Sequence, residues 1–174
     1  IKQRRIEKEL PIENNVVVAG IGCSGNLLHL LEGSQPYGFH GIHGRTLPVS
    51  MGIKTSRPDL NVIIVAGDGD FLGIGAEHIA PQAARNLDVT AVIMDNAVYG
   101  LTKGQFSATA DKGSLSKGGG INQSEPIDCC ALAIQMGCEY VARTFSGDFK
   151  QLGPLIKGAL SHTGTALIDI VSPC

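Results

Sequence analysis

The sequence has no tryptophan, and aromatic residues make up only 5% of it, so small aliphatic side chains must build most of the core. No apolar stretch approaches the roughly 20 residues that span a bilayer, and no N-terminal secretory signal is present. The five cysteines include no CxxC pair, and their odd number argues against a closed disulfide framework. These absences favour a cytoplasmic protein that does not enter a membrane.

Charge is also scarce. Charged residues make up 17% of the chain and the net charge is −2, which leaves no electrostatic footprint for nucleic acid. The one basic run, at residues 2–8, is interrupted by Glu7 and is typical of a solvated helix face. What the chain does have is 43% apolar residues and 23 glycines. With 174 residues it is long enough for a single domain with a hydrophobic core, and a single domain over 1–174 is expected.

Short apolar runs alternate with helical windows along the chain. The runs show no in-out alternation, which indicates strands covered on both faces; they occupy residues 15–20, 61–66, 89–94, 139–142 and 166–171. Helices are predicted at residues 46–55, 74–86, 128–136 and 148–162, the last two with Asp128 and Asp148 as N-caps. This order predicts an α/β fold with a mostly parallel open sheet and helices on both faces. Residues 107–126, rich in Ser, Gly and Lys, are expected to form one long loop.

Glycine-rich stretches follow three of the predicted strands, at residues 20–25, 67–70 and 96–104. In an open parallel sheet the carboxyl ends of the strands share a crevice where ligands bind, so these stretches are expected to converge. Residues 67–70, GDGD, lie between a strand and a helix, where the backbone N–H groups of glycines can close around phosphate oxygens.

Two carboxylates at such a phosphate site would repel the ligand unless a divalent cation lay between them. Mg²⁺ suits this place because it takes oxygen ligands and is often shared between carboxylates and phosphates. The next strand ends at Asp95 and Asn96, and the Asn96 side chain and the Val98 carbonyl can reach the same ion. Asp-Gly pairs are also common in turns, so two ordinary Asx turns are the alternative interpretation.

This spacing resembles the thiamine-diphosphate motif: GDG, then a strand-helix-strand unit, then NN, here with Asp95 in place of the first Asn. The resemblance implies that Asp68 and Asn96 bind Mg²⁺ through their side chains and Val98 through its carbonyl. It also implies that the diphosphate is bound by Gly67, Gly69 and Asp70, the last two through backbone N–H groups.

Further motifs narrow the family. Residues 20–25 (GIGCSG), 41–45 (GIHGR), 74–75 (IG), 99–105 (YGLTKGQ) and 170–174 (IVSPC) occur in this order. Together they resemble the β subunit of 2-oxoacid:ferredoxin oxidoreductases, from about residue 15 to the end. The resemblance implies further cofactor-binding residues, namely Ile21, Gly22, Cys23, Ser24, His43, Gly44, Gly100, Leu101 and Thr102. It also implies catalytic roles for His43, Arg45 and Asn26. Without it, His43 could cap a helix, Arg45 could pair with a local carboxylate, and Thr102 could be a turn hydroxyl.

The cysteines divide between this family pattern and the core. Cys23 and Cys174 match two of the four cysteines that hold a [4Fe–4S] cluster in the family. The other two belong to an N-terminal CPGC-type pair that this sequence lacks, so the chain is expected to be truncated at both ends. Cys129, Cys130 and Cys138 match no ligand motif and are interpreted as core thiols.

The reaction that the resemblance implies is the oxidative decarboxylation of a 2-oxoacid to acyl-CoA and CO₂. It uses thiamine diphosphate and Mg²⁺, and the cluster passes electrons to ferredoxin. No residue matches the glutamate that activates the cofactor in this superfamily, so an α-subunit partner is required. Asn26 stands where many relatives carry Lys or Arg, and an amide cannot neutralise a second substrate carboxylate. This disfavours 2-oxoglutarate somewhat and leaves pyruvate and branched 2-oxoacids open.

Two other functions fit part of the pattern. A non-oxidative thiamine-diphosphate decarboxylase or synthase shares the GDG…N spacing but has no reason to carry the cysteines of GCSG and SPC. A nucleotide-binding module without thiamine chemistry would show no Mg²⁺-dependent binding of that cofactor.

Overall fold

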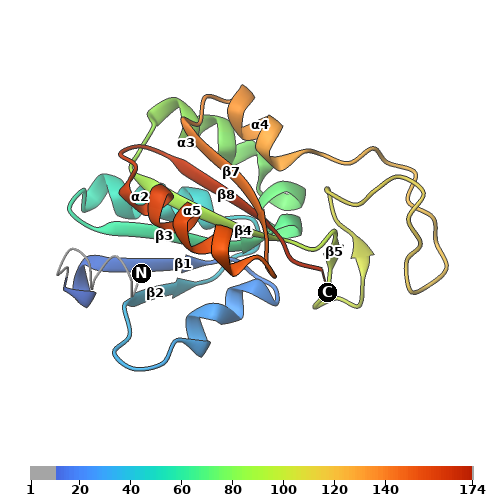
Figure 1. Cartoon of the computed structure of the whole chain (residues 1–174), viewed down its shortest axis with the longest axis horizontal. Helices are drawn as coiled ribbons and strands as arrows, with labels where there is room; N and C mark the ends of the chain where they lie inside the picture. The colour runs from blue at the N-terminus through green and yellow to red at the C-terminus, as the bar shows by residue number, and fades with distance from the viewer. Residues whose placement is uncertain (1–10, 174) are drawn as a thin grey trace.

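The computed structural model describes residues 11–173, and its centre is a six-stranded sheet whose neighbouring strands are all parallel. The strand order is β2-β1-β3-β4-β8-β7 (Figure 1). The strands are β1 (Asn15–Ala19), β2 (Tyr37–His40), β3 (Asn61–Gly67), β4 (Val89–Asp95), β7 (Tyr140–Phe145) and β8 (Ala166–Val171). The predicted α/β fold with a mostly parallel sheet is confirmed. The basic run at residues 2–8 and Cys174 lie outside the described residues.

Helices cover both faces of the sheet, as the sequence predicts. On one face, Val62 and Ile64 of β3 belong to the core that includes side chains of α2 (Thr46–Ser56), α3 (Ile79–Arg85) and α4 (Cys129–Gln135). On the other, Ile63 and Val65 pack with α5 (Phe149–Ser161) and the 3₁₀ helix η2 (Ser24–Leu30) (Figure 1). Successive residues of β3 therefore point to opposite layers, and their β-branched side chains fill both. No helix within residues 11–173 is long and apolar enough to cross a membrane.

The helix predicted at residues 74–86 begins earlier and is broken into parts. Directly after Asp68 the chain forms a π-helical turn, η3 (Gly69–Ile74), then the 3₁₀ turn η4 (Ala76–His78), and only then α3. Pro81 has no N–H to extend α3 backwards by a regular helical bond, and the glycines at 73 and 75 disfavour a continuous helix. The sequence missed η3 because its π-helical form depends on the packing around it.

β7 also extends beyond the predicted residues 139–142. Arg143 lies opposite Asp169 of β8, and its Nε donates to Asp169 Oδ2 at 2.8 Å. This ion pair continues the strand pairing past the end of the apolar run. The two predicted N-caps are confirmed, since the Asp128 and Asp148 side chains accept backbone N–H groups of α4 and α5.

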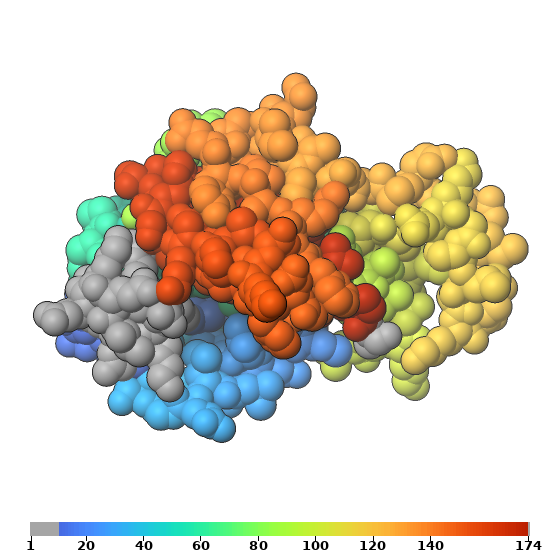
Figure 2. Space-filling view, viewed as in Figure 1, coloured from blue at the N-terminus to red at the C-terminus, as the bar shows by residue number. Residues whose placement is uncertain are grey.

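Residues 107–126 contain no helix and no strand of the sheets. They follow the hairpin of β5 (Val98–Tyr99) and β6 (Gln105–Phe106). Ser107 and Thr109 contact Asp68 at the strand ends, and the part of the loop beyond them projects from the body of the molecule, as the yellow lobe of Figure 2 shows. Their own hydrogen bonds give the loop a defined shape. The Asn122 side-chain amide donates to the carbonyls of Ala110 and Asp111, and an isolated bridge joins Leu115 and Ile121.

Three cysteines interpreted as core thiols lie in or beside the hydrophobic core. Cys129 is buried, and the partly buried Cys138 packs against the same cluster. Cys130 is also partly buried, and burial raises the pKa of its thiol to about 11. Burial raises the pKa of Cys129 and Cys138 as well, so all three remain protonated, weakly reactive thiols near neutral pH.

Candidate functional site

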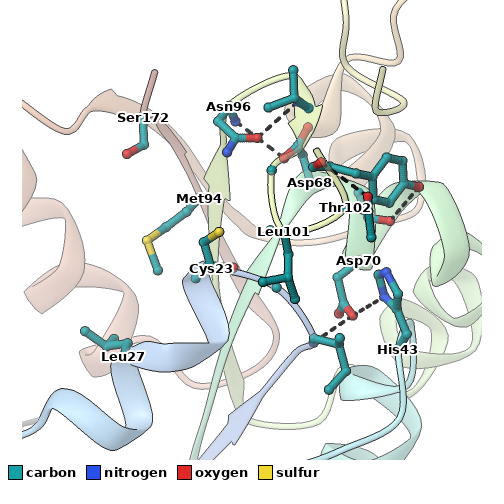
Figure 3. A pocket seen from close by; sticks show the side chains of 18 of the residues that line it. Cys23, Leu27, His43, Asp68, Asp70, Met94, Asn96, Leu101, Thr102 and Ser172 are labelled. Atoms are coloured by element: carbon teal, nitrogen blue, oxygen red, sulfur yellow. Dashed lines mark hydrogen bonds and ion pairs between the residues drawn. The ribbon is translucent and has the colours of Figure 1, made fainter. Parts of the chain in front are cut away.

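A cavity of about 410 Å³ opens at the carboxyl ends of β1, β3, β4 and β8. Strand ends of an open parallel sheet form such crevices because the connections leave them in different directions. Figure 3 shows the cavity with its walls drawn from several segments. It is lined by Ile21, Gly22, Cys23, Ser24, Leu27, Leu30, His43, Gly67, Asp68, Gly69, Asp70, Met94, Asn96, Val98, Tyr99, Gly100, Leu101, Thr102, Ser172 and Pro173.

The structure brings together most of the residues that the sequence singled out. Every described residue predicted to bind the cofactor or the metal ion lines the cavity, apart from Gly44. Gly44 lies just outside, with a backbone φ of +73° and a Cβ position that Ile74 blocks at 2.7 Å, so only glycine fits there.

Arg45 and Asn26, predicted as catalytic, do not line the cavity. The Arg45 guanidinium forms an ion pair with Glu77 at 3.2 Å and donates to the Ile74 carbonyl at 3.3 Å. This is the local pairing that the sequence left open as an alternative. Asn26 is exposed in η2, where Ser24 and Leu27 face the cavity instead, because successive residues of a 3₁₀ helix point in different directions.

Asp68 and Asn96 lie next to each other although 28 positions separate them. The Asn96 backbone N–H lies 3.4 Å from Asp68 Oδ1, and Asp68 is only 2% exposed. Ala97 has a left-handed φ of 62°, which is rare for a residue with a side chain. This sharp turn keeps both Asn96 and Val98 at the cavity, and the Asn96 side chain accepts the Val98 N–H at 3.1 Å.

Asp70 has a different orientation from the one the sequence suggested. Its Oδ1 accepts the backbone N–H groups of Ile21 at 3.0 Å and Gly44 at 2.9 Å, and lies 2.6 Å from His43 Nδ1. Figure 3 shows Asp70 turned toward His43, while Asp68 lies nearer Asn96. The Asp70 carboxylate is thus engaged away from Asn96, and the role predicted for Asp70 needs only its backbone N–H. Asp70 instead ties the loops that follow β1 and β2 to the loop that follows β3.

Tyr99 is the main cavity residue that the sequence missed. Its hydroxyl donates to the Gly69 carbonyl at 3.1 Å, and its ring meets His43 edge-on at 6.1 Å. A Cβ at Gly69 or Gly73 would lie 2.5 Å or 1.9 Å from Tyr99 atoms, so both glycines make room for this ring. Burial, then the charges of the two aspartates of GDGD, raise the pKa of its hydroxyl. The spacing of Gly69 and Gly73 was the sequence signal that a bulky side chain packs against this turn.

Five further residues that line the cavity were not predicted from the sequence: Leu27, Leu30, Met94, Ser172 and Pro173.

Asp95, at the end of β4, is electrostatically coupled to Asp68. Burial, followed by the charges of Asp68 and Asp169, raises the pKa of Asp95 to about 6. The Thr109 hydroxyl lies 2.7 Å from both Asp68 Oδ2 and Asp95 Oδ1. One hydroxyl proton cannot serve both contacts at once, so Thr109 donates to one of the two carboxylates at a time.

Asp95→Asn is expected to stabilise the metal-free protein at neutral pH more than at acidic pH. The pKa of Asp95 is higher in the folded protein than its ordinary value of 3.8, so protonated Asp95 favours the folded state. This stabilisation is complete only below about pH 3.8 and is lost as the pH rises through about 6. A neutral amide of the same shape removes that loss. Urea unfolding in EDTA between pH 4 and 8 measures it, and parallel pH profiles for the two proteins would contradict the assignment.

The residues at the cavity fit a magnesium diphosphate group. A carboxylate, a side-chain amide and a backbone carbonyl form a set of oxygen donors that suits Mg²⁺, which usually shares its other positions with phosphate and water. Residues 11–173 contain no group of three or more His, Cys, Asp or Glu side chains that could hold a metal ion by themselves. Glycines line the same wall, and a Cβ at Gly67 would approach the Ser24 hydroxyl to 3.2 Å.

An open parallel sheet, with oxygen donors and glycines gathered where its strands end, defines an α/β protein suited to a phosphorylated cofactor. Residues 20–170 match the model of the thiamine pyrophosphate enzyme, C-terminal TPP binding domain, and the chain belongs to this family.

Relatives of known name share most of this chain. It is 45% identical to the 2-oxoacid:ferredoxin oxidoreductase subunit beta of a Sulfolobus species, over 99% of this chain and 57% of the relative. It is 38% identical to the 2-oxoglutarate oxidoreductase subunit KorB of Mycobacterium tuberculosis, over 93% of this chain and 43% of the relative. The chain spans about half the length of the curated relatives it matches.

A solved structure agrees in fold. The 2-oxoglutarate:ferredoxin oxidoreductase from Magnetococcus marinus, with 2-oxoglutarate, coenzyme A and succinyl-CoA bound, matches with a TM-score of 0.92 and 35% identity. The match covers 99% of this chain and 58% of that one. The resemblance inferred from the motifs is confirmed.

Proposed function

We propose that this chain is the thiamine-diphosphate-binding part of the β subunit of a 2-oxoacid:ferredoxin oxidoreductase. With its partner it would convert a 2-oxoacid and coenzyme A into acyl-CoA and CO₂, passing electrons through a [4Fe–4S] cluster to ferredoxin. The observation that carries the proposal is the meeting of the GIGCSG, GIHGR, GDGD, DN and YGLT segments around one cavity. The names of the relatives support the same reaction class.

In this proposal, different residues of the cavity bind different parts of the cofactor. Asp68 and Asn96 hold Mg²⁺ through side-chain oxygens, and Val98 through its carbonyl. The backbone around Gly67, Gly69 and Asp70 receives the diphosphate, because its glycines leave N–H groups accessible. The turn of Gly100, Leu101 and Thr102 closes the same wall.

The other wall would position the reacting end of the cofactor. Bound thiamine diphosphate supplies the electron sink for decarboxylation of the 2-oxoacid. Ile21, Gly22 and Ser24 line this wall, and His43, held by Asp70, is the imidazole that can contact substrate there. We do not extend a catalytic role to Arg45 or Asn26, which lie outside the cavity.

Cys23 is placed to serve as a cluster ligand in this scheme. It is exposed, lines the cavity, and its Sγ would lie 3.6 Å from a Cβ at Gly100. Pro173 also lines the cavity and precedes Cys174, the second proposed ligand. The two remaining ligands would come from protein outside this chain, because four thiolates hold such a cluster.

The α subunit would supply the glutamate that activates the cofactor. The free state of the four described cysteines supports a reducing, cytoplasmic location.

Calorimetric titration of thiamine diphosphate, with excess Mg²⁺ and again with EDTA, tests the site. Binding that requires Mg²⁺ supports the proposal, whereas indifference to Mg²⁺ favours a nucleotide-binding module. The full-length β subunit, the α subunit and coenzyme A are then combined with pyruvate, 2-oxoglutarate or a branched 2-oxoacid, and reduction of ferredoxin is followed. Decarboxylation without ferredoxin reduction would favour the non-oxidative alternative.

A further inference from the structure

The segment that follows β6 folds back onto the strand ends and reaches the carboxylate of Asp68. The Ser107 hydroxyl donates to Asp68 Oδ2, and Thr109 Oγ1 lies 2.7 Å from the same oxygen. The two hydroxyl oxygens are 3.1 Å apart. Because Ser107 is only 8% exposed and Asp68 only 2%, water competes little for these contacts. Oδ2 of Asp68 is therefore held by two protein hydroxyls.

The other oxygen of Asp68 is held much more loosely. Among the described residues, Oδ1 accepts only the Asn96 backbone N–H, at 3.4 Å, which is long for a hydrogen bond. Asp68 and Asn96 both line the cavity. The carboxylate is thus asymmetric, with one oxygen satisfied by the loop and the other available to a ligand beside Asn96.

Resting on the function proposed above, we propose that Ser107 and Thr109 are positioning residues that make Asp68 a one-oxygen ligand for Mg²⁺. Their charge-assisted hydrogen bonds hold Oδ2 and prevent the carboxylate from turning both oxygens toward one ion. Mg²⁺ requires a small octahedral site, whereas Ca²⁺ takes more ligands and accepts both oxygens of a carboxylate. The two hydroxyls therefore favour Mg²⁺ over Ca²⁺ in addition to strengthening its binding.

The two hydroxyls are not equivalent as probes. Thr109 also contacts Asp95 Oδ1 at 2.7 Å, so its removal disturbs two carboxylates. The Ser107 hydroxyl contacts Asp68, the Thr109 hydroxyl and the Thr109 backbone N–H. Ser107→Ala therefore removes a direct contact to Asp68 but none to Asp95, and Thr109→Ser tests whether the hydroxyl or the methyl group of Thr109 matters.

Calorimetric titration of thiamine diphosphate into the full chain, with excess Mg²⁺ or excess Ca²⁺, measures the preference. Ser107→Ala and Thr109→Val are expected to weaken Mg²⁺-supported binding about tenfold or more, the usual effect of losing a partner of a metal ligand. Binding supported by Ca²⁺ should fall less, so the ratio of the two affinities shifts toward Ca²⁺. Thr109→Ser should keep the wild-type ratio.

Lys112→Ala is the matched control. It breaks the ion pair with Glu125 in the same loop without touching Asp68, and the Mg²⁺/Ca²⁺ ratio should stay unchanged. Equal losses with both cations, or no loss, in Ser107→Ala and Thr109→Val would overturn the inference while leaving the proposed function intact. If Thr109→Val does not fold, Ser107→Ala decides the question. A wild-type chain that binds the cofactor with neither cation would refute the proposed function itself.

Discussion

Asp68→Ala is expected to weaken Mg²⁺-dependent binding of thiamine diphosphate by about 100-fold or more. Loss of a partner that merely orients a metal ligand costs up to about 100-fold in affinity, and the loss of a ligand should cost at least that. Asp68 is the only one of the two GDGD carboxylates that lies beside Asn96. Without it, a diphosphate at this wall loses its bridging cation. Calorimetric titration in excess Mg²⁺ measures the effect.

The fold of Asp68→Ala should survive, which separates loss of binding from loss of structure. Removing Asp68 takes an acceptor from the Ser107 and Thr109 hydroxyls, but these can still donate to each other and to Asp95 Oδ1. The loss of the Asp68 charge, which raises the pKa of Asp95, also relieves a repulsion in the metal-free protein. Asp59→Ala is the matched control, because this carboxylate is exposed and paired with Arg57. Wild-type affinity in a folded Asp68→Ala protein would refute the assignment of the metal site.

The central strands were predictable because burial on both faces leaves an unmistakable pattern. β1, β3, β4 and β8 consist largely of Val, Ile, Ala and Leu, and no alternation with polar residues interrupts them. β2 carries no such pattern. It is an edge strand with the sequence YGFH, and all four residues are exposed. Its Gly38 leaves room for Leu28 of η2, since a Cβ there would lie 2.6 Å from that side chain. Only the folded arrangement reveals why this segment is a strand.

The place of the site was predictable for a similar reason, but its internal contacts were not. Strand-end geometry brings residues 20–25, 67–70 and 96–102 to one edge whatever their exact conformation. The direction of a side chain depends on distant partners. Arg45 faces away because Glu77, 32 positions later, pairs with it. Thr109 reaches Asp68 because the segment after β6 returns to the sheet. No local sequence pattern predicts this course of the chain.

Asp70→Ala is expected to reduce the free energy of unfolding by about 3 kcal/mol. A buried donor left without its acceptor costs about 1–3 kcal/mol, and this carboxylate serves the N–H groups of Ile21 and Gly44 as well as the ring of His43. Water does not easily replace it, because Asp70 is 2% exposed and a Cβ at Gly20 would come within 2.4 Å of its Oδ2. Asp70→Asn keeps an acceptor oxygen for the two N–H groups and should lose less. Urea unfolding of the metal-free chain measures both.

Replacing each aspartate of GDGD by alanine should therefore have a different main effect: Asp68→Ala should lose cofactor binding, and Asp70→Ala should lose stability. Asp68→Ala leaves a folded protein that binds the cofactor about 100-fold more weakly or worse. Mg²⁺ and thiamine diphosphate at a concentration that just saturates the wild-type chain should therefore not raise its melting temperature. Asp70→Ala leaves Asp68 and Asn96 in place but frees the loops that carry Ile21 and His43. Because a ligand stabilises the state that binds it, the cofactor should restore part of the lost stability in this variant. Wild-type stability in metal-free Asp70→Ala would show that the three contacts of Asp70 do not hold the loops, and a cofactor-induced rise in Asp68→Ala would contradict its role in binding.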